Sequence, residues 1–296
     1  MPFTHFYFVA SAFLLALGSV LSKVLLAMEN SNGQALNPLV VLTTQLMGGV
    51  TFLVAVRSVQ GWHAGLLTEL RRPLISGLIV GVGSIGTIFA LALISASEAS
   101  LIFATQPIIV LALAFVLLRE RVSQPVMLLC FTAVAGVLLT VIGAEDVGVT
   151  GRFAGLVFAL LSTSCAALYT VWMRAISGQQ DLLTALIVVQ AIACLVSAGA
   201  WISLSPGNPG FDGSVPIAFA ALIGAIYYGA AFYSYLLGLK TVTASTAGIY
   251  LSLVPVFTIA LARAVLSERL TALQCVGAAV VVIAVIAVFM FSREDA

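Results

Sequence analysis

Long apolar runs follow one another along the 296 residues of this chain, separated by short polar segments. A bilayer core about 30 Å thick is crossed by about 20 apolar residues in a helix, so these runs indicate transmembrane helices. They are continuously apolar rather than alternating, which excludes the strands of a membrane barrel. The sequence therefore predicts an all-α integral membrane protein with ten transmembrane helices. The runs cover residues 6–27, 38–56, 73–94, 99–118, 126–143, 153–173, 182–204, 215–238, 244–266 and 272–291.

The composition excludes several other classes of protein. Only 8% of the residues are charged, against about 25% in a typical soluble domain. The net charge of +1 offers no basic surface for nucleic acid. The expected partner is the lipid bilayer, because the long apolar runs are stable there. The four cysteines are scattered through apolar runs without a C-x-x-C pair, and neither a disulfide framework nor a metal site is predicted.

Lysine and arginine residues predict the orientation, since cytoplasmic loops carry the excess of positive charge. With ten spans, eight of the twelve lie on one side of the membrane. The other side receives Lys23, Arg152, Arg263 and Arg269. We therefore expect both termini in the cytoplasm. The first run lacks a basic leading segment and a cleavage site, so we interpret it as a retained helix rather than a signal peptide.

The two halves of the chain resemble each other at an offset of 148 residues. Residues 96–122 and 244–270 align without gaps and share ten of 27 positions. The shared positions include Pro107 and Pro255, each followed thirteen residues later by Glu-Arg. We therefore predict two five-helix repeats, 1–148 and 149–296. Because five is odd, the second repeat is expected to cross the membrane in the opposite sense, and inverted repeats are typical of secondary transporters. Duplication for stability alone is the alternative.

The same offset pairs small residues of the third and eighth runs. Gly77 and Gly81 correspond to Ala225 and Gly229. Small residues four apart let helices approach closely in lipid. Gly81 also begins a G-x-G-x-x-G pattern that ends at Gly86, but it lies inside an apolar run without the strand that nucleotide binding requires.

Ten spans, two five-helix halves and a helix ending in Pro … Glu-Arg in each half resemble the drug/metabolite transporter superfamily, in particular paired EamA-type domains. The similarity covers the whole chain and is greatest at 96–122 and 244–270. Within the superfamily the chain resembles bacterial amino-acid exporters, including aromatic amino-acid exporters of the YddG type. The resemblance implies export across the bacterial inner membrane, through a central cavity formed mainly by the first, third, fourth, sixth, eighth and ninth runs. From the inverted repeats we expect alternating access about this cavity, by a monomer or weak homo-oligomer.

Uncharged polar and aromatic side chains at mid-membrane depth are the candidates for contact with a solute. A serine or threonine hydroxyl often bonds to its own helix, so each also has a structural interpretation. The amide of Gln106 has several groups that need partners. Tyr227 and Tyr228 lie away from the interfacial aromatic belt and could offer rings and hydroxyls to an amphipathic solute, although such stripes are also common in packing.

The prolines in the fourth and ninth runs would each free a backbone carbonyl four residues earlier, at Phe103 and Leu251. These bends either line the pathway or only shape the bundle. We predict a substrate cavity formed by one set of residues. The set is Ser84, Thr87, Phe103, Gln106, Pro107, Tyr169, Tyr227, Tyr228, Ser252 and Pro255.

Charged residues are absent from the middle of the runs, where a charge is costly and presumed functional. Lys23 lies near a helix end, from which its long side chain can extend to the membrane surface. Glu98 completes a capping-box pattern that starts at Ser95, and the alternative for Glu98 is gating or proton coupling. A cavity without a charge favours a neutral or zwitterionic solute, such as an amino acid, moved without strong proton coupling.

Two other functions remain as alternatives. One is the export of another metabolite or drug, coupled to protons through Glu98. The other is an integral membrane enzyme, which is disfavoured because the apolar runs hold no histidine or paired carboxylate for acid–base or nucleophilic chemistry. No cofactor is predicted, and the chain has no phosphate-binding loop for ATP-driven transport.

Overall fold

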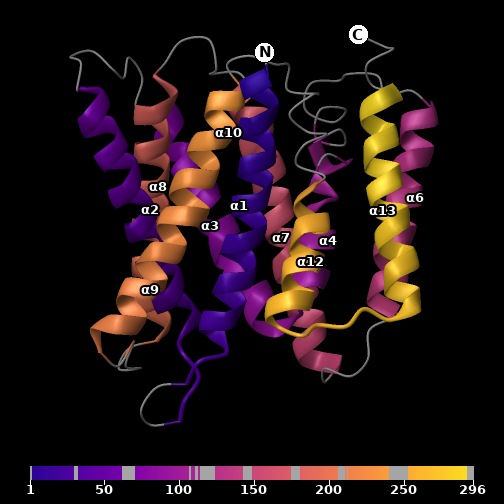
Figure 1. Cartoon of the computed structure of the whole chain (residues 1–296), viewed down its shortest axis with the longest axis horizontal. Helices are drawn as coiled ribbons and strands as arrows, with labels where there is room; N and C mark the ends of the chain where they lie inside the picture. Colours follow the sequence, from indigo (N-terminus) through magenta and orange to yellow (C-terminus); the bar gives the residue numbers. More distant parts are fainter. Residues whose placement is uncertain are drawn as a thin grey trace.

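Helices make up almost all of the described chain, as the apolar runs predict. The computed structural model describes residues 2–29, 33–61, 71–106, 108–110, 113, 124–142, 149–174, 181–205, 211, 213–239 and 253–291. Within these ranges the only β-type contact is an isolated bridge between Glu29 and Ala35. Figure 1 shows the helices side by side. In chain order they are α1 (Pro2–Leu26), α2 (Pro38–Gln60), α3 (Arg71–Leu93), α4 (Ala96–Phe103), α6 (Gln124–Ile142), α7 (Val149–Arg174), α8 (Leu182–Leu204), α9 (Ser214–Gly224), the π-helix η1 (Ala225–Ala231), α10 (Phe232–Leu239), α12 (Leu253–Val265) and α13 (Ala272–Phe291).

Six of the described helices are long and apolar enough to cross a membrane. They are Phe6–Leu26, Pro38–Gln60, Arg71–Leu93, Gly151–Thr170, Leu182–Leu204 and Ser214–Gly238. Three shorter apolar helices, Ala96–Val110, Leu253–Val265 and Ala272–Ala284, lie in other predicted runs. Each of the ten runs thus contains described helix, while the number of crossings stays a prediction.

Glycines on α3 let this helix pack between α7 and α8. A Cβ on Gly77 or Gly81 would collide with Ile192 or Val196 of α8. A Cβ on Gly86 would instead collide with the backbone of α7. The close approach predicted for the small residues of this helix is therefore confirmed, and its glycine-rich pattern serves helix packing.

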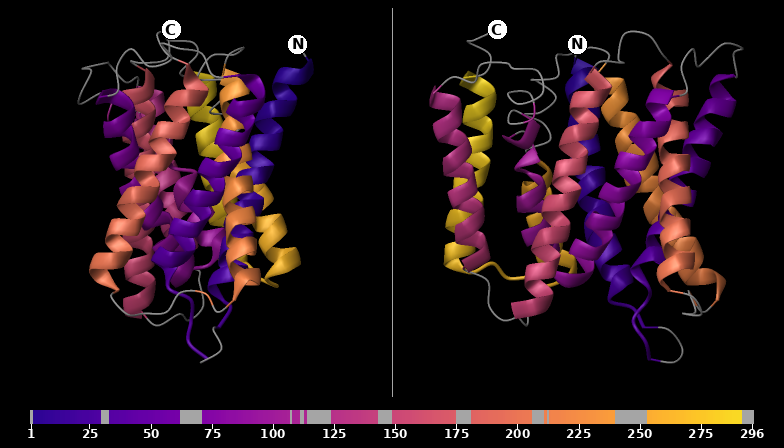
Figure 2. Two further views of the ribbon diagram at one scale, coloured as in Figure 1. Left: turned by 90° about the vertical axis from the view of Figure 1, so that its left-hand side faces the viewer. Right: turned by 180° about the vertical axis from the view of Figure 1, so that it is seen from behind.

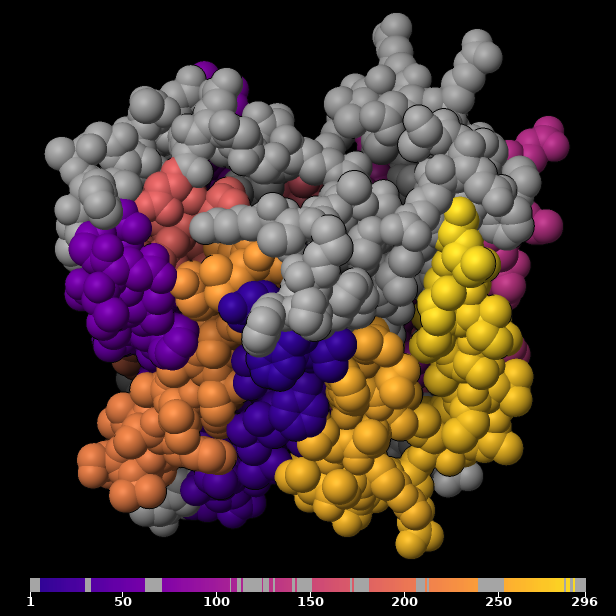
Figure 3. All heavy atoms as spheres, turned by 45° about the horizontal axis from the view of Figure 1, so that its top comes forward, coloured from indigo at the N-terminus to yellow at the C-terminus, as the bar shows by residue number. Residues whose placement is uncertain are grey.

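The third segment of the second half packs in the corresponding way. The continuous helix formed by α9, η1 and α10 lies against α1 and α2, as α3 lies against α7 and α8. Gly229 approaches Phe52 of α2 so closely that a Cβ would collide with its ring. Figure 3 shows α1 on the molecular surface between α10 and α12.

Two further helix pairs lie at opposite ends of the long axis. The α6–α13 pair occupies one end, and α2 and α8 pack together at the other (Figures 1 and 2). In each pair, one helix comes from residues 1–148 and its partner from 149–296. The contacts between the halves are therefore spread along the whole bundle.

Polar contacts show which helix ends lie together. Lys23, in the last turn of α1, bonds to carbonyls at the end of α3. Arg152, in the first turn of α7, bonds to Glu98 in the first turn of α4. Lys23 and Glu98 also interact electrostatically. The end of α1 and the start of α7 are therefore at the same end of the bundle, so these two helices run in opposite directions (Figure 2).

Candidate functional site

Polar side chains join α3 and α7 in the interior of the bundle. The hydroxyls of Thr87 and Ser162 share a hydrogen bond of 2.6 Å, and Thr87 also donates to the carbonyl of Gly83. The rings of Phe89 and Phe158 stack nearby, with their centroids 5.0 Å apart. Thr87 thus has the helix bond expected of a structural threonine and a second contact across the helix interface.

The amide of Gln106 also reaches α7. Its Nε2 donates to the Thr170 hydroxyl over 3.1 Å, and that hydroxyl donates to the carbonyl of Ala166. The preceding residue, Thr105, is buried and bonds to the carbonyl of Ile102. Gln106 therefore has at least one of the partners that its amide requires, and this partner is an uncharged hydroxyl.

The α-helical hydrogen-bond pattern changes around Gln106. Regular α4 ends at Phe103, and the backbone N–H groups of Thr105 and Ile108 bond three residues back rather than four. A tightened turn next to a proline is consistent with the N–H that proline lacks, because this removes one hydrogen bond of a regular α-helix. Pro107 and Ser252, both predicted for the cavity, lie outside the described residues. Pro255 is described, and it is buried in the first turn of α12.

Tyr227 and Tyr228 lie on the π-helix η1, a rare form that is frequent at functional sites. Their rings meet edge to face at 4.7 Å, and Tyr228 also stacks on Phe232 at 6.5 Å. Tyr228 is only 3% exposed. Its side chain lies near Ser84, so the structure brings together two residues of the predicted cavity.

Glycines on two neighbouring helices make room for the two tyrosines. A Cβ on Gly18 of α1 would collide with Tyr227, and a Cβ on Gly49 of α2 would collide with Tyr228. Tyr227 also lies near Ser19 of α1. The tyrosine pair is therefore fixed between α1, α2 and α3, and Tyr169 of α7 lies separately, near Tyr235 of α10.

Buried amides form a part of this interior that the sequence interpretation missed. Gln45 donates to Ser22 over 2.9 Å. Gln190 is fully buried, and its Nε2 lies 3.5 Å from the carbonyl of Tyr228. The Oε1 of Gln190 has no hydrogen-bond partner among the described residues. The sequence does contain a signal for them, because any glutamine inside an apolar run has amide groups that need partners, as Gln106 does.

Glu98 lies at the end of the bundle where α1 ends. The predicted capping box is confirmed, because Ser95 accepts from the N–H of Glu98 and the carboxylate accepts from the N–H of Ser95. The same carboxylate accepts from Arg152 at 2.9 Å and from Gln274 at 3.4 Å. Its side chain is 7% exposed. A helix cap alone needs none of these extra partners, so both interpretations of Glu98 remain open.

The ammonium group of Lys23 bonds to the backbone at one end of the bundle. Its Nζ donates to the carbonyls of Leu91 and Ile94, at 2.7 and 2.8 Å. These carbonyls belong to the last residues of α3 and the turn that follows, where a helix has no internal donors left. A lysine there satisfies them and favours the negative end of the helix dipole.

Charged side chains in the described residues are confined to helix ends and connecting segments. At the end opposite Glu98, Arg57 of α2 pairs with Asp181, the N-cap of α8, at 2.9 Å. Among the described residues, no three or more His, Cys, Asp or Glu side chains gather as a metal site would require. The interior contacts around Ser84, Thr87 and Gln106 are made by uncharged groups.

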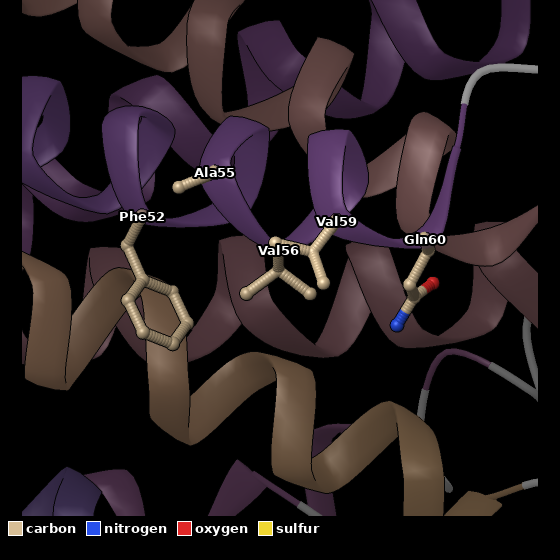
Figure 4. A pocket seen from close by; sticks show the side chains of 5 residues that line it. All are labelled: Phe52, Ala55, Val56, Val59 and Gln60. Atoms are coloured by element: carbon tan, nitrogen blue, oxygen red, sulfur yellow. The ribbon is translucent and has the colours of Figure 1, made fainter.

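A groove of about 330 Å³ lies along α2, lined by Phe52, Ala55, Val56, Val59 and Gln60 (Figure 4). Val59 is 89% exposed. None of these residues belongs to the predicted cavity. In a chain that crosses a bilayer, an apolar groove on an exposed helix face is the surface that lipid covers.

Comparison with known proteins identifies relatives for the whole chain. The model of the EamA-like transporter family matches residues 2–142 and again residues 153–290. A solved crystal structure matches with a TM-score of 0.64 and 17% identity, over 97% of this chain and 99% of that chain. At this identity the likeness concerns the fold. Among curated protein sequences there is no match.

Proposed function

Because this chain belongs to the EamA-like transporter family, a family of membrane transporters of the drug/metabolite kind, we propose that it exports small neutral or zwitterionic solutes. Amino acids are the proposed class, including aromatic ones. The double family match carries the proposal, since two similar halves are the architecture with which secondary transporters alternate access to a central site.

The proposed architecture has ten transmembrane helices in two inverted repeats, 1–148 and 149–296. The opposite directions of α1 and α7, which occupy corresponding places in the two repeats, support the inversion. The packing of α3 on α7 and α8 supports it too, because the α9–η1–α10 helix packs on α1 and α2 in the corresponding way. We place the protein in the bacterial inner membrane with both termini in the cytoplasm, as a monomer or weak homo-oligomer.

The chemistry of the interior supports the proposed solute class. Hydroxyls and amides around Thr87, Gln106 and Tyr228 can bond to polar groups, and the nearby rings can cover an apolar or aromatic side chain. A solute with a net charge normally requires a fixed opposite charge at its site. In the described residues, charges lie at the helix ends instead, which favours a solute without net charge.

Counterflow in liposomes tests the function. Purified protein is reconstituted into vesicles loaded with one unlabelled amino acid, and the entry of labelled amino acids is followed against protein-free vesicles. We expect at least one neutral amino acid to accumulate transiently. If no neutral or zwitterionic solute moves, but a charged metabolite does, the proposed solute class is wrong.

Proton-coupled export is the second candidate, and the burial of Glu98 between Arg152 and Gln274 favours it. A pH gradient across the same vesicles separates the two. Uphill movement of solute driven by the gradient and lost in Glu98→Gln supports coupling. Movement that only follows the solute's own gradient supports uncoupled export.

A further inference from the structure

A carboxylate from the second half of the chain is seated on the start of a helix from the first half. Glu268, just after α12, accepts from the backbone N–H groups of Ala96 and Ser97, at 3.0 and 3.2 Å. It also accepts from the Ser97 hydroxyl at 2.7 Å. The first N–H groups of a helix have no partners within it, and their partial positive charge favours an anion. Three hydrogen bonds therefore join Glu268 to α4.

The backbone before Glu268 holds the carboxylate in this position. Ser267 has a φ of 57°, in the left-handed region that a side chain disfavours. The N–H of Glu268 donates to the carbonyl of Ala262 at 3.3 Å, which folds the chain back over the end of α12. Such a conformation persists only where surrounding contacts stabilise it, and the bonds to α4 are such contacts.

The Glu268 contact belongs to a wider cluster at this end of the bundle. Glu98 bonds to Arg152 and Gln274, and Lys23 interacts electrostatically with both Glu268 and Glu98. Two cations and two carboxylates therefore balance one another. Gln274 also forms its own capping box with Thr271 at the start of α13. The cluster thus links α1, α3, α4, α7, the first turn of α13 and the segment that precedes it.

This network crosses the line between the two proposed repeats. Glu268, Arg152 and Gln274 come from residues 149–296, while Lys23 and the start of α4 come from residues 1–148. Movement of one half against the other would separate Glu268 from α4. The carboxylate and the helix N–H groups would then need hydrogen bonds from water instead. A part-buried, charge-assisted network of this kind is either formed or broken, and it has no continuous range of arrangements between the two.

We propose that Glu268 and the start of α4 form a latch that holds this end of the bundle closed, and that the latch opens when this end admits solute. This inference rests on the proposed transport function, because only a transporter needs this end to open. Glu268 thereby takes part in opening and closing this end of the transporter. A residue that only caps a helix would have no such role. The ion pair of Glu98 and Arg152 joins the start of the same helix to α7.

The test measures access to a cysteine behind the latch. Ser100 is 3% exposed and lies one turn into α4. In a protein with its four native cysteines replaced, Ser100→Cys is labelled with a membrane-impermeant thiol reagent in vesicles of either orientation. The labelling rate is compared between that protein and versions that also carry Glu268→Gln or, as a matched control, Glu29→Gln. Glu29 loses the same charge at the same end of the bundle.

We expect Glu268→Gln to raise the labelling rate from one side of the membrane by about tenfold, because the bonds to α4 lose the contribution of the charge. Ser97→Ala, which keeps the charge and removes one bond, should give a smaller rise and serves if Glu268→Gln does not fold. Glu29→Gln should leave the rate unchanged. An unchanged rate in Glu268→Gln, or an equal rise in Glu29→Gln, overturns the latch.

The labelling assay needs no solute, so it separates the latch from the proposed function. If Glu268→Gln opens access while counterflow detects no solute, the latch holds and the proposed solute class fails. If counterflow succeeds while labelling is the same in every variant, transport holds and the latch fails.

Discussion

The close packing of α2 on α9 predicts that Gly224→Ala destabilises the protein. Gly224 is the last residue of α9, directly before the π-helix η1. A Cβ there would fall under 3.0 Å from three backbone atoms of Gln45, and a Cβ on Gly48 would meet the backbone of Ala221 in the same way. A backbone cannot rotate away as a side chain can. The two helices would therefore have to move apart.

The expected magnitude follows from two opposing effects. Forcing a methyl group into a packed interface costs about 1–3 kcal/mol, and a clash with backbone places Gly224→Ala at the upper end of this range. Replacing glycine by alanine in a helix favours the helix by about 1 kcal/mol. The net loss is about 2 kcal/mol, which corresponds to a fall in Tm of about 4–8 °C.

Thermal unfolding in one detergent, followed by far-ultraviolet circular dichroism, measures this effect. Scan rates are matched, because unfolding of such proteins is often irreversible. Gly199→Ala on α8 is the control, since a Cβ there has no neighbour within 4 Å. We expect Gly199→Ala to leave the Tm unchanged or to raise it. Equal Tm values for Gly224→Ala and Gly199→Ala would refute the packing argument.

Further predictions concern the charged cluster and the predicted cavity. Arg152→Met removes the cation that bonds to the buried carboxylate of Glu98 and should cost about 3–5 kcal/mol, and an unchanged Tm would contradict the pairing. Gln106→Ala should slow counterflow of the identified solute by about tenfold with the Tm almost unchanged, and unaltered kinetics would exclude Gln106 from the pathway. Tyr228→Phe keeps the ring and removes the hydroxyl that meets Ser84. This variant should slow the transport of solutes that form hydrogen bonds and leave the transport of purely apolar solutes unchanged. Equal effects on both kinds of solute would contradict a polar role for Tyr228.

Local features of this fold could be predicted from the sequence because their causes lie within a few residues. Apolar runs predicted where the described helices are. The Ser95 and Glu98 spacing predicted a capping box, and Gly77 and Gly81 predicted close helix packing. Each of these features depends on a single helix and on the positions in it that carry small, polar or apolar residues.

Contacts between distant segments could not be predicted in the same way. Glu268 meets α4 across 171 residues, and this contact depends on how the halves dock rather than on any local pattern. The π-helix η1 likewise has no sequence signal, since Ala225–Ala231 reads as ordinary helix. By contrast, the capping box of Thr271 and Gln274 is local and has the same spacing as that of Ser95 and Glu98.

The sidedness of the two Glu-Arg motifs tests the inverted architecture most directly. Single cysteines replace Arg121 and Arg269, which correspond at the 148-residue offset, and each is labelled with an impermeant thiol reagent from one side of the membrane and then from the other. The inverted arrangement predicts that Arg121→Cys reacts only from the cytoplasmic side and Arg269→Cys only from the opposite side. Labelling of both positions from the same side would contradict it.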